Sequence, residues 1–236
     1  MEIKKYNSPN FFKDRLGNKP DIVVLHNTGG TSISSAHHWF LNNVSYTSAH
    51  FLVGLDGEVR QYVDLKDGAW CNGTSADKTQ NAFYGNATNN IVKNRSQNAN
   101  LYTVSIEFVG NVSDVLTEKQ IETAVQLINH IKIEVKKIYG RDLKIDREHL
   151  IGHYEIVPKT RAYCGKNIQY NLLIDRLKII EMVEEKIQET KAKTDIVIDN
   201  PFSADDEPVR TKLFMPKKLP SLKRIQAVIH KRFFKK

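Results

Sequence analysis

The chain has 236 residues, of which 40% are apolar and 26% are charged. These values are typical of a soluble globular protein with a sizeable core, and the length fits one α/β domain with a short appendage. No stretch approaches the roughly 18 apolar residues that a membrane-spanning helix needs.

The net charge of +8 belongs to the C-terminal end of the chain. Ten Lys and Arg follow Glu207 but no Asp or Glu, whereas the rest of the chain carries 25 basic and 27 acidic residues. A nearly neutral body argues against nucleic acid as a partner, but the basic end could contact polyanions or anionic membranes. Because Met1 to Tyr6 lack the apolar core of a signal peptide, we expect synthesis in the cytoplasm.

The first predicted strand is the apolar run from Asp21 to Leu25, which ends at His26. A glycine-containing turn follows. Residues 35–41 then place Trp39 and Phe40 at helical spacing. This stretch therefore predicts a strand, a loop and a helix in succession.

A β-hairpin is predicted next, because two apolar runs at 49–53 and 59–63 flank Asp56-Gly57, a strong turn signal. Another strand is expected at 102–109. The residues between, 71–100, are rich in Asn, Gly, Ser and Thr and predict a long surface loop.

Thr117 to Gln120 form a capping-box pattern, and apolar residues at helical spacing continue to Ile138 before Gly140. Helical spacing returns at 172–187. We therefore place a single domain at 1–190, a linker at 191–208, where apolar periodicity is lost, and a basic segment at 209–236. The last part, from Leu219, predicts an amphipathic helix.

Three separated residues are candidate metal ligands: His26, His153 and Cys164. Two imidazoles and a thiolate suit Zn²⁺ and leave a fourth position open, as in catalytic sites. Each residue alone also has a structural interpretation, since an isolated histidine at a strand end is commonly hydrogen-bonded and an isolated cysteine commonly packs in the core.

Several short blocks occur in an order that resembles the N-acetylmuramoyl-L-alanine amidase family, which includes phage endolysins and peptidoglycan recognition proteins. The resemblance covers about residues 20 to 180. The blocks are Val24-Leu25-His26-Asn27-Thr28-Gly29-Gly30, Ser48-Ala49-His50-Phe51-Leu52-Val53 with Asp56-Gly57, Ser105-Ile106-Glu107-Phe108, Gly152-His153-Tyr154-Glu155-Ile156, and Cys164.

The resemblance implies an α/β fold with a central mixed β-sheet flanked by helices, in one catalytic domain with a basic C-terminal extension. It implies Zn²⁺ on His26, His153 and Cys164, with Glu107 as the acidic catalytic residue. The family's basic transition-state residue corresponds to Arg161, three positions before Cys164.

Two features depart from the family pattern. The chain reads Cys164-Gly165-Lys166, where the family usually has Pro-Gly after the last ligand. Many phage members also have a catalytic Tyr just before the histidine of the hairpin strand, where this chain has Ala49. Tyr46 is not an obvious replacement, so the chain resembles the branch that relies on Glu107.

Three further residues are candidate substrate contacts. His50 is expected to line the pocket, although it could equally pack inside a strand. Trp70 could form a wall of the substrate groove or belong to the core. Asn72 begins the Asn-rich loop, whose amides suit sugars and peptide carbonyls.

These features predict zinc-dependent hydrolysis of the amide bond between N-acetylmuramic acid and L-alanine in bacterial peptidoglycan, by a phage or prophage lysin that reaches the wall after release. One alternative is a recognition module that binds peptidoglycan without hydrolysis, which the complete ligand set disfavours. Another is an amidase that recycles muropeptides inside the cell.

Overall fold

The computed structural model describes residues 1–195, and its central feature is a six-stranded sheet. The strand order is β1-β5-β4-β7-β3-β8, and a separate two-stranded sheet pairs β2 with β6. The strands are β1 (Ile3–Lys5), β2 (Phe11–Phe12), β3 (Ile22–Asn27), β4 (Phe51–Val53), β5 (Val59–Gln61), β6 (Gly68–Ala69), β7 (Thr103–Phe108) and β8 (Leu150–Gly152).

The sheet is mixed. Strand β3 lies between β7 and β8 and is parallel to both, β4 is parallel to β7, and β4 and β5 form the predicted antiparallel hairpin. Gly57 at its tip has φ +86°, which favours glycine. The predicted α/β class and mixed central sheet are therefore confirmed.

Two long helices cover one face of the sheet. They are α3 (Glu118–Tyr139) and α5 (Tyr170–Asp195), and α3 begins with the predicted capping box and ends at Gly140 in a left-handed conformation. Val23 and Leu25 of β3 join the core cluster that contains the buried residues of both helices. Because side chains alternate along a strand, Ile22 and Val24 point to the opposite face.

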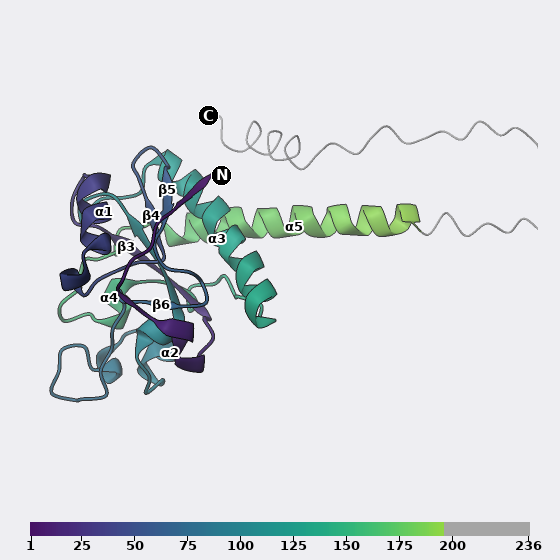
Figure 1. The fold of residues 1–236 in the computed structure, drawn as a ribbon. Helices are drawn as coiled ribbons and strands as arrows, with labels where there is room; N and C mark the ends of the chain where they lie inside the picture. The colour runs from purple at the N-terminus through teal and green to yellow at the C-terminus, as the bar shows by residue number, and fades with distance from the viewer. Residues whose placement is uncertain (196–236) are drawn as a thin grey trace, which may run out of the picture. The chain divides into compact units, whose positions relative to one another are not determined.

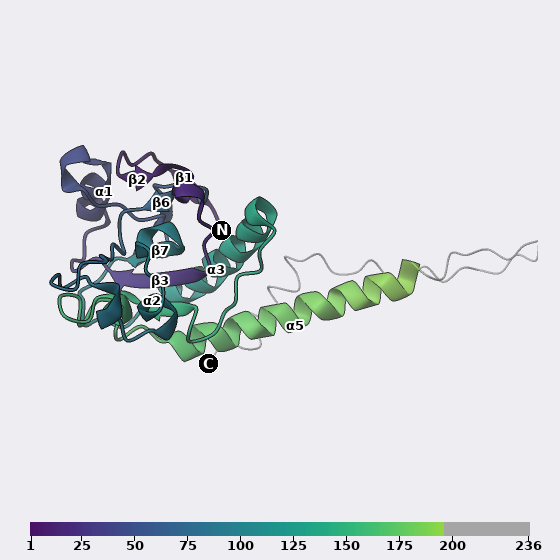
Figure 2. The ribbon, with the colours of Figure 1, turned by 90° about the horizontal axis from the view of Figure 1, so that it is seen from below.

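That opposite face is covered by α1 (Ile33–Leu41) and by the segment between β6 and β7. Figures 1 and 2 show α1 and α3 at opposite sides of the strands. The segment predicted as a long loop contains α2 (Asn90–Lys93) and two short 3₁₀ turns, Tyr84–Asn86 and Ala99–Leu101. The remaining short helical elements are Lys13–Gly17, Asn43–Ser45 and α4 (His153–Ile156).

Contacts divide the chain at Thr190 into units Met1–Thr190 and Lys191–Lys236, although α5 continues to Asp195. The predicted amphipathic helix from Leu219 lies outside the described residues. Within residues 1–195, no helix is long and apolar enough to cross a membrane.

The sequence patterns missed β1, β2, β6 and β8, which have two or three residues each. They also missed Arg15, whose side chain is fully buried. Its guanidinium donates to the carbonyls of Leu65 and Thr103 at 2.9 and 2.8 Å and meets Nε2 of His50 at 2.8 Å. Burial lowers the pKa of Arg15 to about 10, which still leaves it charged at neutral pH.

Replacing Arg15 with Ala is expected to lower the free energy of unfolding by about 3 kcal/mol or more, because buried carbonyls lose their donors. Chemical denaturation measures this change. Lys13→Ala is the control, since Lys13 is exposed in the same segment. Equal stability of the two variants would show that the Arg15 contacts contribute little.

Candidate metal centre and active site

The site lies where parallel strands of the central sheet end. His26 on β3 is paired in register with Glu107 on β7, so the two residues lie at the same position along the direction of the strands. His26 continues the face of Ile22 and Val24, away from α3 and α5. The carboxyl ends of parallel strands are the usual place for ligands in α/β sheets.

His153 reaches the same edge from β8, because α4 begins at His153 directly after Gly152. The N–H of Gly152 donates to Glu155 Oε2 at 2.9 Å, and Glu155 pairs with Arg147 at 3.1 Å. A Cβ on Gly152 would lie 2.6 Å from the hydroxyl oxygen of Tyr170. The close packing at this corner therefore requires glycine and fixes where the His153 backbone begins.

Cys164 comes from the loop after α4. The N–H of Tyr154 donates to the Cys164 carbonyl at 3.1 Å, which ties this loop to α4. Gly165 has φ +77°, and a Cβ there would lie 2.3 Å from the Leu25 carbonyl. The glycine of the unusual Cys164-Gly165-Lys166 sequence is thus what lets the loop approach β3.

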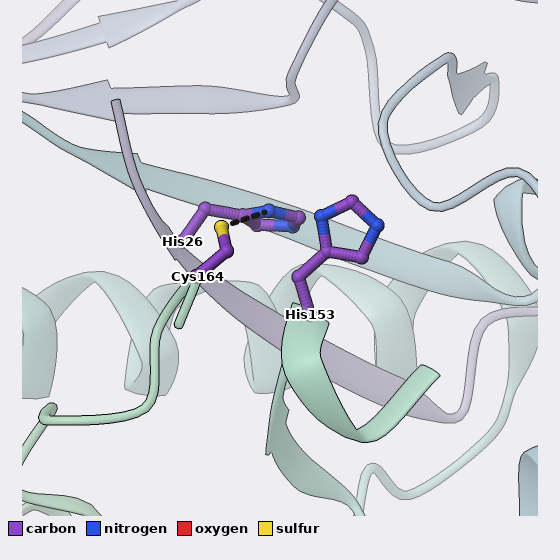
Figure 3. A group of neighbouring side chains, drawn as sticks. All are labelled: His26, His153 and Cys164. Atoms are coloured by element: carbon purple, nitrogen blue, oxygen red, sulfur yellow. Dashed lines mark hydrogen bonds between the residues drawn. The ribbon is translucent and has the colours of Figure 1, made fainter. Parts of the chain in front are cut away.

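The three predicted ligands are brought together, and their ligand atoms all lie within 4.8 Å of one another. Figure 3 shows the two imidazoles and the sulfur gathered from three separate segments. The sulfur of Cys164 is 3.6 Å from Nδ1 of His26. Two ligand atoms with Zn–N of about 2.0 Å and Zn–S of about 2.3 Å in tetrahedral geometry lie roughly 3.5 Å apart, so this pair fits zinc.

Burial determines the protonation of the ligands. It lowers the pKa of His153 to about 3 and that of His26 well below its ordinary value, so both rings are neutral and able to bind a metal. Burial also raises the pKa of Cys164 to about 12 in the metal-free protein. A bound cation would stabilise the thiolate form of Cys164.

Glu107 lies beside this cluster, with Oε1 3.8 Å from Nδ1 of His26. Burial raises the pKa of Glu107 to about 7, whereas a hydrogen bond from Cys71 and the nearby Arg161 charge oppose the shift. The side chain is 12% exposed and lines an open groove of about 560 Å³. The groove also includes Thr28, Trp39 and Thr47. The Glu107 carboxylate is therefore accessible from the groove, next to the candidate metal ligands.

Arg161 is exposed, and its backbone carbonyl accepts a hydrogen bond from the N–H of Cys164 at 3.0 Å. Its positive charge lowers the pKa values of His26, His153 and Glu107. In all three residues, burial has a larger effect on the pKa than this charge. The guanidinium thus acts electrostatically on the centre.

His50 does not line the groove, in contrast to the sequence-based prediction. It is fully buried; Nδ1 accepts from the N–H of Ser105 at 3.0 Å, and Nε2 lies 3.0 Å from the Asp67 carbonyl. The physical reason is Arg15, which occupies the core next to the ring. His50 therefore serves the packing of β4 against β7.

Asn72 is also fully buried, so direct contact with substrate is not available to it. Its Nδ2 donates to the hydroxyls of Thr103 and Ser105 at 3.0 and 2.8 Å. A hydrogen bond with Asn72 raises the pKa of His26, against the dominant effect of burial. Asn72 thus supports a candidate ligand instead of binding substrate.

Trp70 is partly exposed, and its ring packs against Phe12 with centroids 5.5 Å apart. It is not among the residues that line the groove at Glu107. Its role as a wall of the substrate groove stays a prediction.

Two residues at the site were missed from the sequence. Trp39 was identified only as part of a helix, but it is 54% exposed and lines the groove. Cys71 lies within hydrogen-bonding distance of Glu107 Oε1 and His26 Nε2. As one of two cysteines in the chain, Cys71 could be a packing residue, a nucleophile or a metal ligand, but no motif assigned it to the site.

The fold and the site define an α/β protein with a two-histidine, one-cysteine centre and an adjacent carboxylate. Residues 16–167 match the family model of N-acetylmuramoyl-L-alanine amidase, and the chain therefore belongs to this family. The matched range contains His26, Glu107, His153, Arg161 and Cys164, and the resemblance seen in the sequence is confirmed.

One relative is the 1,6-anhydro-N-acetylmuramyl-L-alanine amidase AmpD of Haemophilus influenzae, 27% identical over 131 residues. The alignment covers 56% of this chain and 59% of the relative, less than two thirds of its length. The crystal structure of a selenomethionine AmpD derivative superimposes with a TM-score of 0.53 at 20% identity, covering 75% of this chain and 94% of that chain. This likeness shows a shared fold.

Proposed function

We propose that the chain hydrolyses the amide bond between N-acetylmuramic acid and L-alanine of bacterial peptidoglycan, with Zn²⁺ held by His26, His153 and Cys164. The observation that carries this proposal is the ligand cluster with Glu107 at its side, inside the range that matches the amidase family. Three protein ligands leave a coordination position for water or substrate.

A zinc ion held by His26, His153 and Cys164 would supply a water of lowered pKa and would polarise the carbonyl of the bound amide. In this proposal Glu107 takes the proton of the attacking water, and the position of its carboxylate beside the candidate ligands and at the groove supports that role. It then passes the proton to the L-alanine nitrogen, since an amine leaves readily only when it is protonated. Glu107 is thus a general base that becomes a general acid.

Arg161 stabilises the negative charge that develops on the amide oxygen. Its electrostatic influence on His153 and Glu107 supports this role. Arg161→Ala is expected to lower kcat about 100- to 1,000-fold with little change in KM, because such a donor acts mainly in the transition state. Steady-state kinetics on a soluble muropeptide measure both constants.

Arg161→Lys is the matched variant, since it keeps the charge and is expected to recover part of the loss. A rise in KM alone in Arg161→Ala would instead assign Arg161 to ground-state substrate binding.

The open groove supports a polymeric substrate. It runs from Glu107 along α1, near whose C-terminal end Trp39 offers an exposed ring suited to contact with a sugar face. We propose that the enzyme acts on the cell wall as a lysin. Soluble 1,6-anhydro muropeptides are the second candidate substrate, because the Haemophilus relative is named for that bond.

The function is tested by incubating the protein with Gram-positive sacculi and with a soluble 1,6-anhydro muropeptide, followed by mass spectrometry. Stem peptides with a free L-alanine amino terminus, lost on chelation and regained with zinc, are expected from the sacculi. Turnover of the soluble compound alone would favour the recycling role. Retained wall binding without release would indicate a recognition module.

The basic segment at 209–236 is proposed to attach the enzyme to wall polyanions or anionic membranes, on the basis of its ten Lys and Arg after Glu207. A chain ending at residue 195, where α5 ends, is expected to bind anionic vesicles at least about tenfold more weakly than the full chain. Vesicle sedimentation at low and high salt measures the difference. Equal binding would reject this attachment.

A further inference from the structure

Large side chains are exposed at the C-terminal end of α1 and in the turn that follows it. Trp39 is 54% exposed, Val44 is 66% exposed and Tyr46 is 72% exposed. Within residues 1–195, neither aromatic ring makes a hydrogen bond, a ring contact or a cation–π contact. The packing of the domain therefore does not explain these three side chains, and exposed apolar surface of this kind is typical of an interaction site.

The backbone at Tyr46 is unfavourable for an aromatic residue. Tyr46 has φ +50° and ψ 29°, a left-handed conformation that Gly and Asn adopt more readily. The exposed ring makes no contact of the kinds named above that would offset this strain. Strained residues of this kind are concentrated at binding and active sites. The presence of a tyrosine here therefore indicates a role outside the packing of the domain.

A buried carboxamide holds this turn in place. Asn10 is 2% exposed, and its Nδ2 donates to the carbonyls of Asn42 and Thr47 at 2.9 and 3.1 Å. The same Nδ2 lies 3.1 Å from the hydroxyl oxygen of Ser45. Three positions of the turn are thus tied to one buried side chain, which keeps the Tyr46 ring directed at solvent.

This surface continues the groove at Glu107 and is uncharged. Trp39 and Thr47 line the groove, and Tyr46 directly precedes Thr47 in the chain. Among the groove-lining residues of the described chain, Glu107 is the only charged one. Residues 22–55, which include α1 and the turn, contain no Asp, Glu, Lys or Arg. An uncharged surface with exposed rings suits a neutral polymer, whereas polyanions and anionic membranes are attracted by basic side chains.

We propose that Trp39, Val44 and Tyr46 bind the glycan strand of the wall, beyond the sugar that carries the scissile amide. The choice of a glycan rests on the proposed function, because the groove connects this surface to Glu107. N-acetylated sugars in the intact wall carry no charge, and the apolar face of a sugar ring packs on Tyr and Trp rings. The surface therefore favours the polymeric wall over short soluble muropeptides.

The test is an NMR titration of the full chain with chitohexaose, a neutral oligomer of N-acetylglucosamine that has no scissile lactyl amide. The chain has two tryptophans, so Trp39→Phe identifies which indole N–H signal belongs to Trp39. We expect this signal to shift with chitohexaose, and we expect Tyr46→Asn to raise the Kd about three- to tenfold. Asn tolerates the left-handed backbone, so this variant is expected to fold.

Ile133→Asn is the matched control, because Ile133 is 54% exposed on α3 at the other face of the sheet. It is expected to keep the wild-type Kd. An unchanged Kd in Tyr46→Asn would overturn the proposed role of Tyr46.

The wild-type titration decides the question even if a variant fails to fold. If chitohexaose does not shift the Trp39 signal of a chain that releases stem peptides from sacculi, the glycan surface is overturned and the hydrolase stands. A shift with phosphatidylcholine vesicles alone would assign the surface to a membrane and would also overturn the proposal. A chain that binds chitohexaose through Tyr46 but releases no stem peptides would overturn only the hydrolase.

Discussion

His26→Ala is expected to retain less than about one tenth of the bound zinc and to hydrolyse peptidoglycan at less than about one thousandth of the wild-type rate. His26 is 1% exposed and contributes the ring that contacts Cys164, Cys71 and Glu107. Removing this ring therefore deletes the side chain that the other three residues contact. Metal analysis after gel filtration and release of stem peptides from sacculi measure the two effects.

His130→Ala is the control for this variant, because His130 lies on α3, which packs on the opposite face of the sheet. It is expected to keep full zinc content and activity. Circular dichroism checks that both variants fold. Full hydrolysis by folded, zinc-free His26→Ala would contradict the metal mechanism.

Glu107→Gln is expected to keep its zinc but lose about 100- to 10,000-fold in kcat, because the amide cannot take the proton of the attacking water. The substitution preserves the size of the side chain next to His26, so the ligand cluster should persist. We would measure kinetics on sacculi or a soluble muropeptide and analyse the metal content of the same sample. The two measurements distinguish a slower chemical step from loss of the metal.

Glu58→Gln is the matched control, since Glu58 is a carboxylate on the sheet that pairs with Arg60 and Lys4 away from the centre. It is expected to leave kcat unchanged. If Glu107→Gln retains near wild-type kcat, Glu107 is not the base and another group must accept the proton.

Local patterns were sufficient where an element is long and regular. The apolar run that ends at His26 and the capped helix from Glu118 were both predicted close to their observed bounds. The short strands β1, β2, β6 and β8 were not, because two or three residues carry no periodicity and such strands exist only through their partners.

The candidate ligands could be named from the sequence because the order of short motifs resembles a known family, and the structure brings His26, His153 and Cys164 together. The same approach placed His50 and Asn72 at the substrate, whereas both are buried. The local sequence around a polar residue does not indicate whether its side chain faces an open groove or a buried group such as Arg15.

The fold class, the long elements and the candidate ligand residues could be predicted from the sequence, because hydrophobic periodicity and the order of short motifs can be read along the chain. Which polar side chains meet at the centre depends on the tertiary packing. Cys71 and Cys164 are 93 positions apart in the chain, yet both contact His26, since the β6–β7 segment and the loop after α4 close over the same strand end. Contacts between residues so far apart in the chain depend on long-range packing, which local sequence patterns do not encode.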